Sequence, residues 1–267
     1  ANTEHQDFDV VVVGCGVAGL SAAVAAADAG ARVAVVERST YEERGGNTRY
    51  TAASMRMKSE NEVSDDFESF LVRYSGYHIQ PDFVAATALD YENWPSNVRT
   101  LPFTDPELIS FFVDSVPPAV AWLKQHGVKF GGIGFYGLTP RPTPRIAVSG
   151  GGLQIIEAMT AYAEQKGVRF FYELTAQDLL LSEDGSVAGL KATQKNSQPL
   201  MLHGGAVVLA CGGFEGNTEM VIRYLGSKGR YLRPVARGGY YNKGEGIAMA
   251  LRAGAAPAGD YAGYHAQ

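Results

Sequence analysis

The residues best suited to chemistry lie near the start of the chain, where three glycines follow an apolar run. Gly14, Gly16 and Gly19 have the spacing G-x-G-x-x-G. The first glycine permits a tight turn, the second lets the backbone approach a pyrophosphate, and the third lets a helix pack closely on a strand. Glu37 ends the next apolar run, where a carboxylate can accept hydrogen bonds from ribose hydroxyls. The spacing predicts a dinucleotide site, and the acid favours NAD or FAD over NADP because it would repel a 2′-phosphate.

The elements around these residues have the order that such a site needs. The apolar run at 9–13 predicts a buried parallel strand, the small residues of 17–29 predict a helix, and 32–37 predicts a second strand. The free N–H groups and the positive dipole end of the helix would then face the phosphates. The alternative is a glycine turn that only packs an α/β sheet, which explains the glycines but not the acid at position 37.

The composition narrows the class of protein. The 267 residues could form one large domain or two modest ones, and 46% hydrophobic residues suffice for a sizeable core. A net charge of -5 argues against a nucleic-acid partner. The sequence contains no stretch of about 18 apolar residues, so no membrane span is expected. The polar residues 1–8 argue against a signal peptide. Cys15 and Cys211 make neither a disulfide framework nor a metal site, so a cytoplasmic location is expected.

The remainder of the chain predicts an α/β fold with a mostly helical excursion from the sheet at 57–130. Pro117 and Pro118 are expected to begin a new helix, and the proline-rich stretch 131–152 is expected to form a loop. The turn at 183–186 predicts a β-hairpin. The expected helices are 65–74, 82–95, 106–125, 152–165 and 245–253, the hairpin strands are 176–181 and 187–193, and further strands are 168–172 and 206–210.

Many of the 32 glycines come in pairs or triplets. Such clusters mark places where the backbone bends sharply or touches something closely. Their number suggests a long ligand laid across several loops. The clusters are 45–46, 131–132, 150–152, 204–205, 212–213 and 238–239.

Four segments add motifs to the first strand–helix–strand unit: 44–49, 173–179, 209–215 and 244–250. In this order the set resembles the FAD-binding flavoproteins of the fumarate reductase/succinate dehydrogenase superfamily, and 44–49 is most similar to the tricarballylate dehydrogenase-like branch. The resemblance implies a Rossmann-like FAD-binding domain with a parallel sheet and a β-hairpin insertion. Residues 1–56 and 131–267 would form this domain, with 57–130 as its mostly helical insertion. The chain would be the N-terminal half, without the capping domain and without the C-terminal segment of the FAD-binding domain.

The resemblance also implies which positions bind FAD. Glycines of the first turn and of 212–213 would hold the pyrophosphate, Glu37 the adenosine ribose, and the backbone of Ala176 the adenine. The loop 46–48 would lie along the isoalloxazine edge near N5. The family's Gly-Asp-Gly turn has Glu245 in place of the aspartate, which leaves the role of this residue open. The expected cofactor-binding set is Gly14, Gly16, Gly19, Glu37, Arg38, Gly45, Gly46, Asn47, Thr48, Ala176, Gly212, Gly213 and Glu245.

The chemistry of the loop 46–48 agrees with this assignment. A flavin that accepts hydride at N5 needs small backbone groups and amide donors near N5 and O4, because negative charge develops in the reduced ring. Gly46, Asn47 and Thr48 offer such groups. Taken alone, the loop could also be a glycine turn with a capping Asn47 or Thr48.

Substrate contacts are expected from cations, because the planar fork of arginine binds a carboxylate with two hydrogen bonds. Arg141 and Arg145 lie in the proline-rich stretch, and Arg49 and Arg56 are further candidates. The resemblance places His265 where fumarate reductase relatives use a histidine to bind a substrate carboxylate. The alternatives are exposed surface arginines and a histidine near a loose chain end.

The activity implied is that of an FAD-dependent oxidoreductase that moves hydride between flavin N5 and a carbon next to a carboxylate or carbonyl. The acid or base is expected outside this chain, so no catalytic residue is assigned. One alternative is a ketosteroid-type dehydrogenase of a cyclic ketone, and another is a non-catalytic FAD-binding or assembly subunit. A second polypeptide, either a separate gene product or the other half of a cleaved precursor, is expected to supply the capping domain and the remaining flavin contacts.

Overall fold

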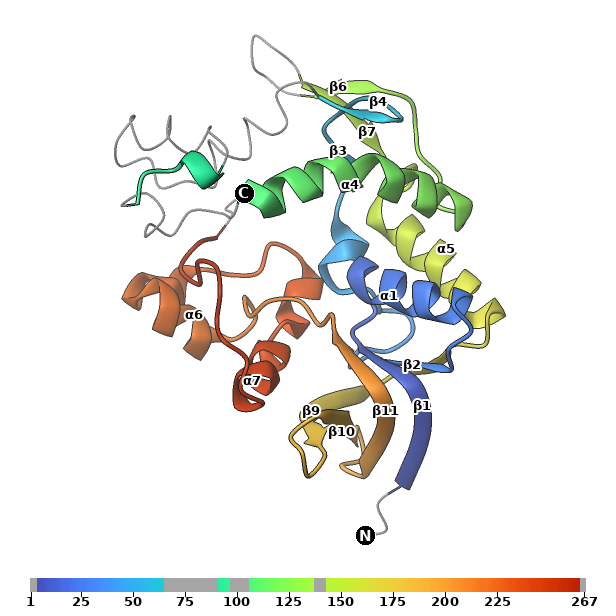
Figure 1. Cartoon of the computed structure of the whole chain (residues 1–267), viewed down its shortest axis with the longest axis vertical. Coiled ribbons are helices and arrows are strands. Elements are labelled where there is room, and N and C mark those ends of the chain that lie inside the picture. Colours follow the sequence, from blue (N-terminus) through green and yellow to red (C-terminus); the bar gives the residue numbers. More distant parts are fainter. Residues whose placement is uncertain (1–3, 65–90, 97–105, 137–142, 265–267) are drawn as a thin grey trace.

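A six-stranded sheet in the order β8-β2-β1-β11-β10-β9 forms the centre of the computed structural model, which describes residues 4–64, 91–96, 106–136 and 143–264 (Figure 1). The first four strands of this order are parallel, and the last two form an antiparallel hairpin. The α/β fold, the parallel sheet and the hairpin insertion are therefore confirmed. The strands are β1 (Glu4–Val13), β2 (Val33–Val36), β8 (Arg169–Phe171), β9 (Leu174–Leu181), β10 (Val187–Gln194) and β11 (Pro199–Leu209).

Helices cover the sheet and extend beyond it. The longer ones are α1 (Val17–Asp28), α4 (Pro106–Gln125), α5 (Gly151–Gln165), α6 (Thr218–Leu225) and α7 (Glu245–Arg252), and the short 3-10 turns are η1 (Gly46–Tyr50), η2 (Tyr91–Asn93), η4 (Ser227–Tyr231) and η5 (Arg237–Tyr241). Within the described ranges, no helix combines the length and the apolar character that crossing a bilayer requires.

The apolar run of β1 is continuous because both faces of the sheet are covered. Val12 packs with Leu20 of α1 in one cluster of buried side chains. Val13, which points to the opposite face, packs in a second cluster with Met249 of α7. A strand buried on both sides has no reason to alternate apolar and polar residues, so the sequence signal of β1 was strong.

Helix α4 departs from the prediction at Pro117 and Pro118, which lie inside one continuous helix rather than at the start of a new one. A proline within a helix removes a backbone hydrogen bond and clashes with the preceding turn. Val116 and Val120 hold the helix on both sides of this defect, because they are buried against Met57 and Ile146. Tertiary packing therefore outweighs the local cost.

The C-terminal end of α4 is tied to α1 and α5 by polar contacts. His126 is buried, with Nε2 3.0 Å from Asp28 Oδ2 and Nδ1 2.7 Å from the carbonyl oxygen of Trp122. The Lys166 ammonium and the Tyr162 hydroxyl both reach the other carboxylate oxygen of Asp28. Hydrogen bonds from Lys166 and then from His126 lower the pKa of Asp28 to about 2. These contacts join the ends of three helices.

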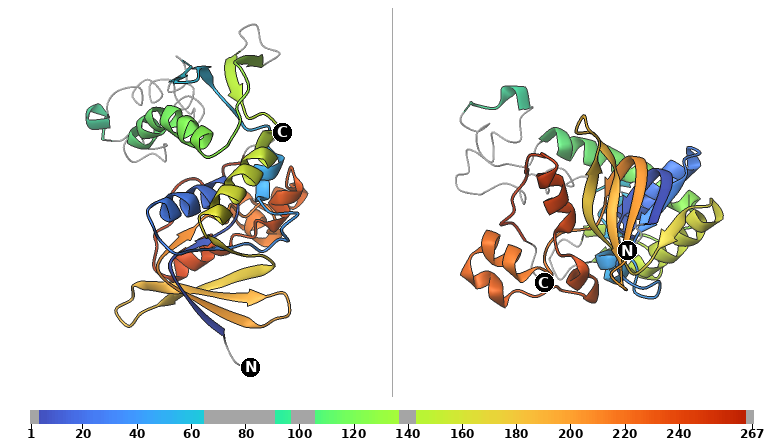
Figure 2. Two further views of the ribbon diagram at one scale, coloured as in Figure 1. Left: turned by 90° about the vertical axis from the view of Figure 1, so that its right-hand side faces the viewer. Right: turned by 90° about the horizontal axis from the view of Figure 1, so that it is seen from below.

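Part of the stretch expected to be a loop forms a hairpin instead. β6 (Gly134–Tyr136) and β7 (Thr143–Ala147) pair antiparallel, and β3 (Ser54–Met55) pairs with the other edge of β7. A short pair, β4 (Met57–Ser59) and β5 (Glu62–Val63), lies beside them. These strands gather at the end of the molecule remote from the N-terminus (Figures 1 and 2).

Other expectations fall partly or wholly outside the described residues. The helix expected at 65–74 and most of the one at 82–95 lie there. The division into a domain of 1–56 and 131–267 with a mostly helical insertion at 57–130 therefore stays a prediction. The helices expected from 17, 152 and 245 are confirmed as α1, α5 and α7, and the strand expected at 206–210 belongs to β11, which begins earlier, at Pro199.

Candidate functional site

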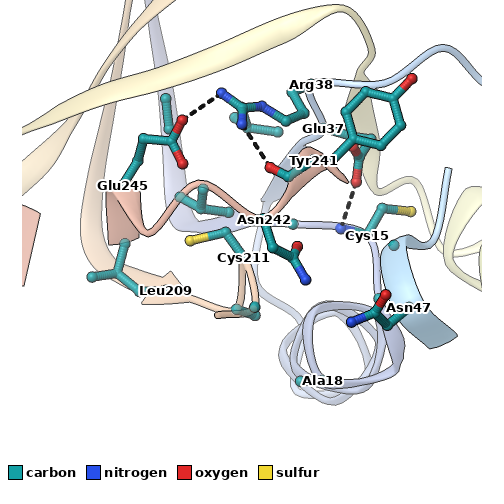
Figure 3. Close-up of a pocket in the computed structure, with 18 of the residues that line it drawn as sticks. Cys15, Ala18, Glu37, Arg38, Asn47, Leu209, Cys211, Tyr241, Asn242 and Glu245 are labelled. Atoms are coloured by element: carbon teal, nitrogen blue, oxygen red, sulfur yellow. Dashed lines mark hydrogen bonds and ion pairs between the residues drawn. The ribbon is translucent and has the colours of Figure 1, made fainter. Parts of the chain in front are cut away.

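A cavity of about 610 Å³ lies where the parallel strands β1, β2 and β11 reach their carboxyl ends (Figure 3). Ligands of open α/β sheets bind at this edge, and the volume falls in the range of small-molecule sites. We call it the main cavity. All of the residues expected to bind the cofactor line it except Gly19, and the lining also includes Cys15, Cys211, Glu215, Tyr241 and Asn242.

The three glycines of the first turn differ in how much room the fold leaves for a side chain. Gly14 has φ of +106°, and an added Cβ would lie 2.5 Å from the carbonyl oxygen of Ala210. A Cβ on Gly19 would lie 1.9 Å from the carbonyl oxygen of Gly14. A Cβ on Gly16 would meet nothing closer than Thr48 Oγ1, at 3.4 Å. The fold itself requires Gly14 and Gly19, whereas Gly16, which lines the main cavity, has room for a Cβ in ordinary contact.

The N-terminus of α1 borders the main cavity through Val17 and Ala18. The Val17 N–H donates to Thr48 Oγ1 at 3.1 Å, so the hydroxyl expected near the flavin edge caps the helix here. Ala18, also in the first turn, has no partner for its N–H within the helix, and it lines the main cavity. An anion in the main cavity would therefore find an amide donor and the positive end of the helix dipole.

Glu37 is buried at the end of β2, and its carboxylate organises the neighbouring turns. Its Oε2 accepts the Cys15 N–H at 3.0 Å, and its Oε1 accepts the Ser39 N–H at 2.8 Å. Each carboxylate oxygen keeps a further lone pair, so ribose hydroxyls can still donate to it. Burial, and after it the negative charge of Glu37, raises the pKa of the Cys15 thiol to about 12, which makes this cysteine unreactive at neutral pH.

Ala176 reaches the main cavity from β9. It pairs with Ala192 beside a register shift between Lys191 and Ala192 in the β9–β10 ladder. Such irregularities leave backbone groups outside the ladder, which suits a contact to a ligand edge. Just before it, the Leu174 N–H donates to the carbonyl oxygen of Glu37 at 3.1 Å, so β9 is tied to the end of β2.

Arg38 joins two walls of the main cavity, as Figure 3 shows. Its Nη1 donates to the carbonyl oxygen of Tyr241 and its Nη2 to Glu245 Oε1, each at 2.7 Å. The residue that replaces the family's aspartate is thus bound by an arginine that follows β2. The Tyr241 hydroxyl donates to Glu43, and this hydrogen bond is the largest cause of a Tyr241 pKa raised to about 12.

A second polar cluster in the lining, formed by Glu215, Asn47 and Asn242, was not predicted from the sequence. Glu215 Oε1 accepts Asn47 Nδ2 at 2.6 Å and Asn242 Nδ2 at 2.7 Å. The only sequence signal for Glu215 is an acid directly after the Gly212-Gly213-Phe214 turn, and nothing local marks Asn242 as its partner. The cluster connects η1, the loop after β11 and the end of η5.

Not every glycine cluster serves a ligand. The clusters 45–46 and 212–213 line the main cavity. At Gly152, in contrast, a Cβ would lie 1.6 Å from the carbonyl oxygen of Thr48, and at Gly238 it would lie 2.2 Å from the carbonyl carbon of Gly46. These glycines let α5 and η5 press on the backbone of η1, so the interpretation of the clusters as ligand contacts was too broad.

The substrate candidates that the structure describes, Arg49, Arg56 and Arg145, do not line the main cavity. Arg145 lies in β7 and is absent from the lining; its Nη1 donates to Ser54 Oγ at 3.3 Å. Its Nε is buried, as is Arg49 Nη1, and neither atom has a hydrogen-bond partner among the described residues. Arg141 and His265 lie outside the described residues, so their roles stay predictions.

The residues of the main cavity fit a bound dinucleotide. Gly16 and the Ala18 amide at the start of α1 match a diphosphate, and the buried acid at the end of β2 matches a ribose. The family described as "FAD binding domain" matches residues 9–267. The match covers almost the whole chain.

Known relatives point the same way. The chain is similar to a vinyl phenol reductase of Lactiplantibacillus plantarum (27% identical over 253 residues, 94% of this chain and 47% of that protein). It is also similar to an NADH:fumarate oxidoreductase of Klebsiella pneumoniae (28% over 255 residues, 94% and 25%). Among solved structures, a 3-ketosteroid-delta4-(5alpha)-dehydrogenase of Rhodococcus jostii matches with a TM-score of 0.68 at 25% identity, over 96% of this chain and 55% of that one. The chain thus spans half or less of the length of the two curated relatives.

Proposed function

This chain belongs to the FAD-binding domain family, within the fumarate reductase/succinate dehydrogenase superfamily of flavoproteins, and from that premise we propose that it is the cofactor-binding part of an FAD-dependent oxidoreductase acting on CH–CH bonds. The single observation that carries the proposal is that Gly16 lines the main cavity although the fold would tolerate a Cβ there, in ordinary contact with Thr48 and Gly45, so packing gives no reason for a glycine at this position. FAD supplies hydride transfer at its N5 atom. The substrate would be a small molecule with a carboxylate or carbonyl next to the reacting carbons.

In this proposal the chain positions the cofactor in three places. Amides of the first turn of α1, with Gly14 and Gly16, hold the diphosphate. Glu37 accepts hydrogen bonds from the adenosine ribose through its unused lone pairs. Amide groups of the loop 46–48 lie at the isoalloxazine edge, where donors stabilise the negative charge of a reduced ring.

The test is a flavin spectrum of the purified protein, followed by anaerobic mixing with candidate donors and acceptors. The proposal is supported if a saturated acid or ketone bleaches the bound flavin, or if its unsaturated partner reoxidises the reduced flavin. Flavin that binds but responds to no donor would assign the non-catalytic role instead. Protein prepared together with its companion chain that neither co-purifies with FAD nor binds it refutes the proposal as a whole.

Two substrate classes have support. The relatives named vinyl phenol reductase and NADH:fumarate oxidoreductase favour a conjugated alkene as the substrate. Fumarate also carries carboxylates. The similarity to a ketosteroid dehydrogenase favours a cyclic ketone. We propose Arg141, Arg145 and His265 as carboxylate contacts. If replacing both arginines with glutamine leaves the turnover of carboxylate substrates unchanged, the cyclic ketone is the better assignment.

We also propose that a second polypeptide completes the site with a capping domain and the remaining flavin contacts. Three large apolar side chains are exposed on the segment from η4 to η5: Tyr231 of η4 (69% exposed), Val235 between η4 and η5 (73%), and Tyr240 of η5 (52%). The last residue of η5, Tyr241, lines the main cavity. Exposed apolar groups at a binding site favour coverage by another segment. Native mass spectrometry tests this, because a stable FAD-loaded monomer of this chain alone would contradict it. The cytoplasmic location stays a prediction that cell fractionation can test.

A further inference from the structure

Glu215 occupies an unusual place in the lining of the main cavity. One of its carboxylate oxygens receives two side-chain amides, from Asn47 on η1 and from Asn242 just after η5. Among the described residues, no lysine, arginine or histidine forms an ion pair with it within 4.0 Å. Its partners are therefore neutral donors that both belong to the cofactor site.

We propose that Glu215 is a positioning residue for Asn47, and that it fixes the amide orientation with which Asn47 meets the flavin. The inference rests on the proposed function, since it assumes that FAD occupies the main cavity. Glu215 itself transfers no proton or electron in this proposal. Its effect on the cofactor passes through Asn47.

The carboxylate of Glu215 allows only one orientation of the Asn47 amide. An ionised carboxylate only accepts hydrogen bonds, whereas the two ends of an asparagine amide differ, with two donors on Nδ2 and an acceptor on Oδ1. Nδ2 of Asn47 must therefore face Glu215, which uses one N–H and leaves the other for a ligand. Without the carboxylate, the amide could present either end to the main cavity.

The backbone around the cluster is built to keep it in place. The Asn242 N–H donates to the carbonyl oxygen of Gly239 at 3.1 Å, and the Gly216 N–H donates to the carbonyl oxygen of Asn242 at 2.8 Å. A Cβ on Gly239 would lie 3.2 Å from Glu215 Oε1 and 3.3 Å from Asn47 Oδ1. The glycine thus leaves room for the carboxylate and the amide to meet.

The experiment compares FAD dissociation constants and visible spectra of bound flavin for Glu215→Ala, Glu215→Gln, Asn47→Ala and the double alanine variant. Glu215→Ala is expected to weaken FAD binding about tenfold or more and to shift the flavin bands, because one amide–flavin hydrogen bond loses its fixed geometry. Glu215→Gln can still accept both amides through its carbonyl oxygen, so it should stay within about threefold of the parent. The double variant should bind FAD no more weakly than Asn47→Ala, since Glu215 acts through that residue.

Glu219→Ala is the matched control, because Glu219 is an exposed acid on α6 paired with Arg223. Glu219→Ala should leave the FAD dissociation constant and the visible spectrum of bound flavin unchanged. The inference is overturned if Glu215→Ala binds FAD as the parent does with an unchanged spectrum, or if its effect adds fully to that of Asn47→Ala. A parent protein that has no FAD affinity even together with its companion chain would instead overturn the proposed function. Thermal unfolding of each apoprotein separates these results from a loss of folding.

Discussion

Gly16→Ala should leave the apoprotein intact and damage cofactor binding. The backbone at Gly16 has φ of -75°, which any residue adopts. The added methyl group would make only ordinary contacts, at 3.4 Å to Thr48 Oγ1 and 3.7 Å to the carbonyl oxygen of Gly45. Replacing glycine at a compatible position stabilises a fold by about 0.4–1 kcal/mol through the unfolded state. The free energy of unfolding of apo Gly16→Ala is therefore expected to be equal to or slightly above that of the parent.

The effect on FAD follows from where the methyl group would project. It would lie between Gly16 and the loop at Gly45 and Thr48, three residues that line the main cavity, where we expect the diphosphate to approach the backbone. Moving a phosphate out by about 1 Å breaks one or two hydrogen bonds from backbone amides to the anion, each contributing about 1.5–3 kcal/mol. A net loss of about 2–4 kcal/mol corresponds to a dissociation constant for FAD that rises about 30- to 1000-fold.

The assay is titration of apoprotein with FAD, followed by flavin fluorescence, together with denaturant unfolding of each apo variant. Gly132→Ala is the control, because an added Cβ there meets nothing within 4 Å and its φ is unstrained. Gly19→Ala is the contrast, because its Cβ would lie 1.9 Å from the carbonyl oxygen of Gly14 and should destabilise the apoprotein itself. Unchanged FAD affinity in Gly16→Ala would show that the diphosphate does not lie at this turn, and the reasoning would fail.

Three further variants test other parts of the site and fold. Gly152→Ala puts a Cβ 1.6 Å from the carbonyl oxygen of Thr48, so it should lower the free energy of unfolding by about 1–3 kcal/mol and weaken FAD binding; an unchanged denaturation midpoint would contradict the packing. Arg38→Lys should speed FAD release in stopped-flow experiments, since lysine lacks the fork that reaches both the Tyr241 carbonyl and Glu245, and a parent-like release rate would argue against this clasp. For Asp28, a pKa lowered to about 2 means that its contribution to stability is present above the ordinary value of 3.8 and is lost as pH falls toward 2. The stability difference between the parent and Asp28→Asn should therefore shrink across that window in denaturant titrations, and a difference independent of pH would refute the ionic role.

Local sequence patterns sufficed to predict the part of the cofactor site that lies at the ends of β1 and β2. The turn at Gly14 and the strand that ends in Glu37 follow from short-range rules, namely apolar runs for strands buried on both faces and glycine where a helix must pack on a turn. The hairpin of β9 and β10 was likewise marked by its own turn residues. These features depend on neighbours in sequence, so the sequence alone sufficed to predict them.

Elements stabilised by distant packing were predicted less well. Pro117 and Pro118 signal a helix start by local rules, yet buried contacts of Val116 and Val120 keep one continuous helix. The hairpin of β6 and β7 was expected as a loop because its prolines are poor strand formers. In both places the tertiary contacts outweighed the local preference.

The tertiary structure alone decided which polar groups share the main cavity. Arg38 meets Glu245 across 207 positions of the chain, and Asn47 meets Glu215 across 168. No periodicity or motif encodes such pairs, because they depend on how η1, η5 and α7 pack around the strand ends. The sequence determined that a dinucleotide fits at the end of β1, whereas the fold determined which side chains hold the rest of the site in place.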